Sequence, residues 1–138
     1  MKTAIVYYSY GGSTKKLAEQ MAQEKQMDCI GIQDVSRPGK LKAYTAGILA
    51  AIRQKNWPIQ PIDVKWDEYE EIILMAPVWA SCPVPQINSV IQLLPPGKEI
   101  VYMAVSASGA STAKEKIQAA IEEKGCSLKE YQDIRTGK

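Results

Sequence analysis

Histidine is absent from this chain of 138 residues, which excludes Ser-His-Asp triads, Cys-His dyads and histidine-ligated zinc. Cysteine is scarce: Cys29, Cys82 and Cys126 are odd in number, widely spaced and without a C-x-x-C pair. Such a set disfavours a disulfide or metal framework and fits a reduced, cytoplasmic location. Any catalysis must therefore rest on chemistry that needs no histidine.

An excess of charge of one sign is also missing. The chain has 17 Lys plus Arg against 15 Asp plus Glu, a net charge of +2, and its cations are scattered, which gives no electrostatic case for nucleic acid binding. The apolar run Ala4–Tyr8 is shorter than the roughly 7 to 15 residues of a signal-peptide core, and no run approaches a membrane span. We expect one domain over residues 1–138.

Apolar segments of strand length alternate with helical segments along the whole chain, a pattern typical of a parallel α/β sheet. The third and fourth strand segments are apolar at successive positions, so we expect them at the centre, and the last alternates as an edge strand does. Right-handed crossovers then favour a doubly wound five-stranded parallel sheet of order 2-1-3-4-5. The expected strands are Thr3–Tyr8, Met27–Ile32, Glu71–Ala76, Glu99–Val105 and Leu128–Ile134, and the expected helices are Ser13–Lys25, Leu41–Gln54, Pro85–Leu94 and Thr112–Lys124.

The loop after the first strand has the chemistry of a phosphate cradle. Two glycines let backbone amides approach an anion, three hydroxyls add donors, and a helix begins directly afterwards. Lys15 and Lys16 in the first helical turn oppose the helix dipole unless an anion is bound there. The alternative is that both lysines face water and the glycines only form a turn. The candidate residues are Ser9, Tyr10, Gly11, Gly12, Ser13 and Thr14.

Other phosphate motifs are missing from the chain. It has no G-x-x-x-x-G-K-[ST] and no G-x-G-x-x-G after a strand. Instead, Ile5-Val6-Tyr7-x-Ser9-x-x-Gly12-x-Thr14-x-x-x-Ala18 resembles the FMN-phosphate signature of flavodoxins. It departs from that signature at Gly11, where many flavodoxins carry a hydroxyl, and at Met21. The resemblance implies a flavodoxin-like fold, here apparently without the C-terminal helix, and FMN as cofactor.

Two further loops fit this resemblance. In the flavodoxin-like family the loop after the third strand borders the isoalloxazine, which implies that Trp79 lies against the flavin ring; otherwise Trp79 packs on neighbouring loops. The loop after the fourth strand meets the pyrimidine end and lacks the second aromatic residue of many flavodoxins, which leaves one ring face open. Cys82, beside the proposed flavin, is interpreted as a structural thiol. The candidate residues are Pro77, Val78, Trp79 and Ala80, then Ser106, Ala107, Ser108 and Gly109.

Three functions are compatible with these residues. The first is an FMN electron carrier between redox partner proteins, and the second is a small NAD(P)H-dependent FMN or quinone reductase that uses the open ring face. The third is a flavin-free interaction module with the same fold. Flavodoxins are typically acidic, whereas this chain has a pI of about 8.4, so its partners should differ in surface charge.

Two features predict a homodimer or a higher oligomer. The segment Ala43–Ile52 is apolar on nearly every face, as buried helices are, so we expect it to meet another subunit or to border the flavin. The chain also ends four residues after the last expected strand, where a flavodoxin continues into a helix that covers the sheet. We therefore expect a second subunit to cover that face. Trp57 and Trp66 are interpreted as packing residues.

Overall fold

The structure is a computed structural model that describes residues 2–10, 12–34, 39, 46, 49, 59–62, 64–79, 82–106 and 114–135. Five parallel strands form a sheet in the order β2-β1-β3-β5-β6, and a short sixth strand pairs antiparallel with β3. This is the order 2-1-3-4-5 expected from the sequence. The strands are β1 (Thr3–Tyr8), β2 (Asp28–Ile32), β3 (Glu71–Trp79), β4 (Cys82–Pro83), β5 (Glu99–Ser106) and β6 (Ser127–Arg135).

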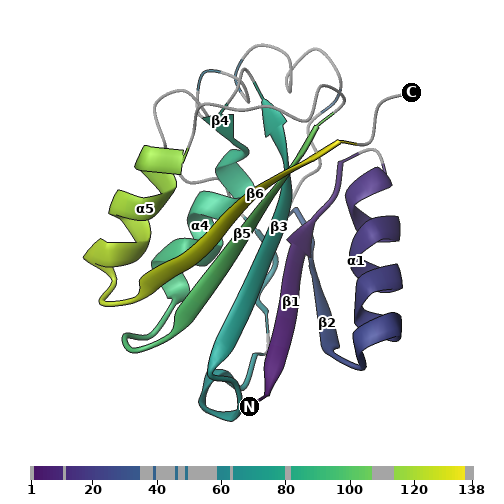
Figure 1. Ribbon diagram of the computed structural model, residues 1–138. Coiled ribbons are helices and arrows are strands. Elements are labelled where there is room, and N and C mark those ends of the chain that lie inside the picture. Colours follow the sequence, from purple (N-terminus) through teal and green to yellow (C-terminus); the bar gives the residue numbers. More distant parts are fainter. Residues whose placement is uncertain are drawn as a thin grey trace.

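The described helices cover both faces of the sheet, with α1 on one face and α4 and α5 on the other (Figure 1). Each follows a strand, as the alternating sequence pattern predicts. None of the helices in the described ranges is long and apolar enough to cross a membrane. The helices are α1 (Ser13–Lys25), α4 (Pro85–Leu93) and α5 (Lys114–Glu123), with a short 3₁₀ turn η2 (Trp66–Glu68) before β3.

The core forms two layers, one on each side of the central strands. Alternate residues of β3 face opposite sides: Ile72 and Leu74 pack with α4 and α5, whereas Ile73 and Met75 pack with α1. Residues of β5 divide in the same way. This explains why the sequences of these two strands are apolar at successive positions, and it confirms their central place.

β6 forms the edge beside β5, as its mixed sequence predicts. Ile100 pairs with Leu128 but Val101 pairs with Glu130, so Lys129 is one extra residue in a bulge. The Lys129 ammonium reaches across β5 to the Glu71 carboxylate of β3 at 2.8 Å. This hydrogen bond to Glu71 raises the pKa of Lys129.

The sheet face on the α1 side is already buried in the single chain. Ile73, Val101 and Met103 are only 5 to 6% exposed. These residues therefore do not need a second subunit to cover them. The oligomer stays a prediction. The predicted helix over Leu41–Gln54 lies outside the described residues except at Ala46 and Leu49, and so does Trp57.

Two strands continue into segments that were predicted to be loops. The third strand was predicted to end at Ala76, with Pro77, Val78 and Trp79 in a loop, but β3 continues to Trp79. It continues because Val78 and Trp79 pair with Pro83 and Cys82 in an antiparallel hairpin. Ser106, also predicted in a loop, is the last residue of β5 and pairs with Arg135.

Candidate cofactor-binding site

The predicted site residues that the structure describes lie at or beside the carboxyl ends of β1, β3 and β5. From β1 the chain passes to β2 on one side, and from β2 it crosses to β3 on the other, so the winding reverses between β1 and β3. Open α/β sheets bind ligands at this point, outside the carboxyl ends of the strands. In Figure 1 this edge is at the top.

The loop between β1 and α1 is built around Gly12. Gly12 has φ +101°, a left-handed conformation that glycine adopts without steric cost, and a Cβ there would meet no atom within 4 Å. Its N–H donates to Ser9 Oγ at 3.0 Å, and its carbonyl accepts from the Lys16 N–H at 3.1 Å. Because Ser9 Oγ accepts here, its own hydroxyl hydrogen is left to donate elsewhere. Gly11 lies outside the described residues.

The first turn of α1 is arranged to receive an anion. Gly12, at the N-cap, has no side-chain oxygen, no capping side-chain hydrogen bond is made, and no acidic residue lies in the first turn. The backbone N–H groups at this helix end therefore lack the usual capping partner and carry partial positive charge. Lys15 and Lys16 add full charges. This donor set fits a phosphate group, since phosphate binds at helix N-termini of this kind.

The hydroxyls of the loop have different surroundings. Ser13 is exposed, whereas Thr14 is only 3% exposed. Tyr10 is half-buried and packs against the core layer of α4 and α5. Ser13 is thus the most exposed of these residues, Ser9 is half-buried like Tyr10, and Thr14 and Tyr10 have a packing role in addition to any ligand contact.

The β3–β4 hairpin and the end of β5 lie beside this loop in the sheet order. Pro77 pairs with Val105 of β5, and Val78 packs against the core on the α4 side. Trp79 is placed by its pairing with Cys82, so its backbone lies at the same edge of the sheet as Ser9. The remaining predicted residues, Ala80, Ala107, Ser108 and Gly109, lie outside the described residues.

A partly buried hydrogen-bonded cluster next to the site was not predicted from the sequence. The Tyr8 hydroxyl donates to Asp34 Oδ2 at 2.6 Å, and Gln86 Nε2 donates to Asp34 Oδ1 at 3.0 Å. Tyr8 and Gln86 are 1% and 0% exposed. The three residues come from β1, the end of β2 and the first turn of α4, so the cluster ties these elements together. In the sequence, Tyr8 is typical of an apolar strand and Gln86 is typical of a solvent-facing position in a first helical turn. Neither residue was therefore predicted to form a hydrogen bond next to the site.

Cys82 is the thiol nearest to the predicted site. It is 7% exposed, and the Lys116 ammonium lies 3.8 Å from its sulfur. Burial agrees with the structural role expected from the sequence. In the described ranges, no group of three or more Cys, Asp or Glu side chains could hold a metal ion.

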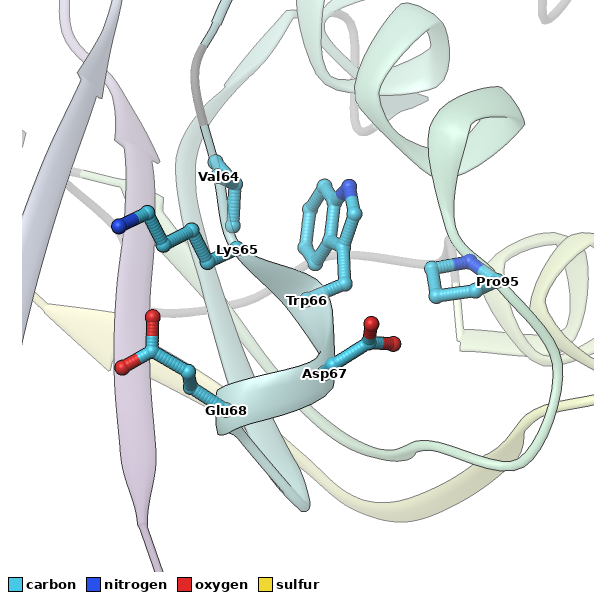
Figure 2. A pocket seen from close by; sticks show the side chains of 6 residues that line it. All are labelled: Val64, Lys65, Trp66, Asp67, Glu68 and Pro95. Atoms are coloured by element: carbon cyan, nitrogen blue, oxygen red, sulfur yellow. The ribbon is translucent and has the colours of Figure 1, made fainter.

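A separate pocket of about 470 Å³ lies at the opposite end of the sheet, where the strands begin. Figure 2 shows the Trp66 indole and the Pro95 ring on opposite sides of it, with the Asp67 carboxylate below. η2 precedes β3 and Pro95 precedes β5, so this pocket is at the amino ends of the strands. None of its lining residues is fully buried. Trp66 packs against the core, as predicted.

Several solved structures are similar to this chain over nearly its whole length. A flavoprotein from Lactobacillus acidophilus NCFM in complex with FMN matches with a TM-score of 0.81 and 22% identity, over 94% of this chain and 91% of that one. The apo-form of the flavoprotein from the same organism matches with a TM-score of 0.70 and 22% identity, over 96% and 92%. Oxidised flavodoxin 1 from Bacillus cereus matches with a TM-score of 0.60 and 15% identity, over 100% and 86%.

At these identities the likeness shows the fold. No protein-family model and no curated protein matches the chain. The sheet order, the placement of the helices and these neighbours together establish a flavodoxin-like α/β fold.

Proposed function

We propose that this protein with a flavodoxin-like fold binds FMN at the carboxyl ends of β1, β3 and β5 and transfers electrons. The observation that carries the proposal is the loop from Ser9 to Thr14, where a left-handed Gly12 and an uncapped helix N-terminus meet at the point of reversed winding. A solved neighbour with the same fold is described as a complex with FMN.

Each part of the site has its own role in this proposal. The Ser9 and Ser13 hydroxyls and the first backbone N–H groups of α1 bind the phosphate, and Lys15 and Lys16 favour its negative charge. Trp79, beyond Pro77 and Val78, lies against the ring. FMN, when bound, supplies the redox chemistry, and the protein supplies binding, orientation and electrostatics. A chain without histidine can therefore serve in electron transfer.

Titration with FMN tests the cofactor. We expect saturable quenching of tryptophan fluorescence and a changed visible spectrum of the flavin, and weaker binding of riboflavin, which lacks the phosphate. If neither signal changes on titration, the chain is a flavin-free module with this fold, and the carrier and reductase hypotheses both fail.

Substitution of Ser9 tests the phosphate cradle. Ser9→Ala removes a donor to the phosphate and the acceptor that holds Gly12, so we expect the Kd for FMN to rise about 10- to 100-fold, the size of a hydrogen bond to a charged group. Ser127→Ala is the matched control, because Ser127 is exposed at the start of β6, at the other end of the sheet. Equal affinities for FMN in the two variants would refute this role of Ser9.

A second titration separates the carrier from the reductase. Rapid bleaching of the bound flavin by NADPH or NADH would favour an NAD(P)H-dependent FMN or quinone reductase. Flavin that stays oxidised with both nucleotides favours a carrier that exchanges electrons with redox proteins. We favour the carrier.

The thiols agree with a reducing compartment. Cys29, Cys82 and Cys126 are all free, and Cys82 and Cys126 are buried. Free thiols of this kind are usual in the cytoplasm, where we propose that the protein acts.

A further inference from the structure

Exposed cations surround the candidate FMN site, one beside each of its three segments. Lys15 lines a pocket of about 180 Å³ together with Ser9. The Lys116 ammonium lies 3.8 Å from the sulfur of Cys82, which pairs with Trp79. Arg135 pairs with Ser106 at the end of β5. Lys16 and Lys114 lie in the same first helical turns, so five exposed cations gather at the carboxyl ends of the strands.

Few acids oppose these cations at this edge. In the described ranges they are Asp34, Glu115 and Asp133. Asp34 is half-buried and lines the same pocket as Lys15, and its carboxylate oxygens accept hydrogen bonds from Tyr8 and Gln86. The described part of this edge therefore has five cations against three acids, and Lys114, Lys116 and Arg135 are the cations that lie outside the proposed phosphate site.

The amino ends of the strands have the opposite balance. There, with the last helical turns included, the nine acids outnumber the six cations: the acids are Glu24, Asp28, Asp67, Glu68, Glu70, Glu71, Glu99, Glu122 and Glu123, and the cations are Lys2, Lys25, Lys65, Lys98, Lys124 and Lys129. Three of these cations are engaged locally: Lys2 pairs with Glu68, Lys129 with Glu71, and Lys98 donates to the Tyr69 carbonyl. The fold thus separates charges that are scattered along the sequence, with the positive end at the cofactor edge.

We propose that this cationic edge is the docking surface for an acidic electron-transfer protein. The inference rests on the proposed FMN function, since a partner must approach the flavin closely. The cations extend from α1, beside β1, to the end of β6, a width of three strand spacings or about 14 Å. Such a spread matches a protein surface better than one phosphate group, and complementary charge accelerates the encounter of two proteins.

Electron transfer to proteins of opposite charge tests the surface. The FMN-loaded protein is photoreduced without oxygen, with EDTA as the electron donor, and is mixed with cytochrome b5, an acidic haem protein, or with horse cytochrome c, a basic one. Two haem irons each accept one electron, and the fully reduced flavin anion becomes oxidised FMN with release of one proton to solvent. We expect the rate with cytochrome b5 to fall as salt is added, and the rate with cytochrome c to rise or stay constant.

Charge reversal locates the effect. At about 20 mM ionic strength, where the Debye length is about 20 Å, Lys116→Glu with Arg135→Glu should lower the rate with cytochrome b5 at least tenfold. The control, Lys25→Glu with Lys65→Glu, makes the same change in net charge at the other end of the sheet and should change the rate less than about twofold. Equal effects of both pairs, or a cytochrome b5 rate that does not respond to salt, would overturn the docking surface.

Equilibrium binding separates this proposal from the cofactor proposal. Calorimetric titration of the flavin-free protein with oxidised cytochrome b5 at the same ionic strength should show binding that Lys116→Glu with Arg135→Glu weakens at least tenfold. If the natural protein binds FMN but the double variant binds cytochrome b5 as tightly as the natural protein does, only the docking surface is refuted. If the natural protein does not bind FMN but the double variant still binds cytochrome b5 at least tenfold more weakly, only the FMN proposal is refuted.

Discussion

Two tyrosines, in the strands on either side of β3, have opposite hydrogen-bonding states. The Tyr8 hydroxyl donates to the Asp34 carboxylate at 2.6 Å, a charge-assisted bond in a buried setting. The Tyr102 hydroxyl is also buried but has no hydrogen-bond partner among the described residues, and its ring stacks on Tyr131 with centroids 5.6 Å apart. Burial raises the pKa of Tyr102 well above its usual value. The two hydroxyls should therefore affect stability with opposite signs.

Removal of each hydroxyl tests this difference. Tyr8→Phe should lower the free energy of unfolding by about 1 to 3 kcal/mol, because Asp34 loses a buried donor. Tyr102→Phe should leave it unchanged or raise it, because an unsatisfied polar atom is removed. Urea unfolding of both variants measures the effect. A Tyr102→Phe protein as unstable as Tyr8→Phe would contradict this assignment.

Tyr69 lies at the other end of the sheet, among charged residues. Its hydroxyl donates to Asp28 Oδ2 at 2.6 Å, and the Lys2 ammonium lies 5.2 Å from its ring centroid. The hydrogen bond to Asp28, followed by burial, raises the pKa of Tyr69 to about 12. The folded chain therefore holds the phenol proton more tightly than the unfolded chain, whose pKa is about 10.

This shift predicts a loss of stability in alkali. The contribution of Tyr69 is complete below about pH 10 and is lost as the pH rises toward about 12. Thermal unfolding at several pH values should show a steeper loss for the natural protein than for Tyr69→Phe over this range. Tyr7 and Tyr102 are present in both proteins, so their titration affects both stability curves equally. If the two curves of thermal stability against pH run parallel, the hydrogen bond to Asp28 does not shift the pKa of Tyr69.

At the scale of elements, the turn from α5 to β6 depends on Gly125. Gly125 has φ +79°, and a Cβ there would lie 2.9 Å from Pro96 Cβ. Gly97 has a similar φ of +88°, but its Cβ would meet nothing within 4 Å. The last helix was predicted to extend to Lys124, and α5 ends at Glu123, directly before this turn.

The two glycines form a matched pair for substitution. Gly97→Ala should cost about 1 kcal/mol for its left-handed backbone alone, and Gly125→Ala should cost at least about 1 kcal/mol more because of the contact with Pro96. Chemical unfolding of each variant measures the difference. Equal losses would mean that the chain yields around Pro96 at no cost.

Strands and helices were predictable where burial fixes the pattern. β3 and β5 are apolar at successive positions because both of their faces are buried, and this alone places them at the centre of the sheet. The continuation of β3 to Trp79 was not predictable, because Pro77 is typical of a loop and the pairing with Cys82 is a tertiary contact. The bulge at Lys129 likewise arises from pairing with β5.

The candidate site was predictable only in part. Gly12 indicates a turn between β1 and α1 in the sequence, because few other residue types adopt its φ of +101°. The bonds from Tyr8 and Gln86 to Asp34 join residues 26 and 52 positions apart, and no local pattern marks such a pair.

At the scale of the whole molecule, the distribution of charge matters more than its sum. A net charge of +2 does not show which surface a partner would approach. The sheet topology, however, brings Lys15, Lys116 and Arg135 together at the carboxyl ends of the strands. The same topology places the segments predicted to bind FMN at that edge and the pocket at Trp66 and Pro95 at the other. We therefore expect a flavin to bind at the carboxyl ends of β1, β3 and β5.

Nuclear magnetic resonance of the ¹⁵N-labelled protein during titration with FMN tests this claim most directly. We predict saturable shifts of the backbone amides of Gly12, Ser13, Thr14, Val78 and Ser106, with amides of η2 unchanged. Shifts that concentrate at Val64 to Glu68, around the Trp66 pocket, or the absence of any saturable shift would contradict the account.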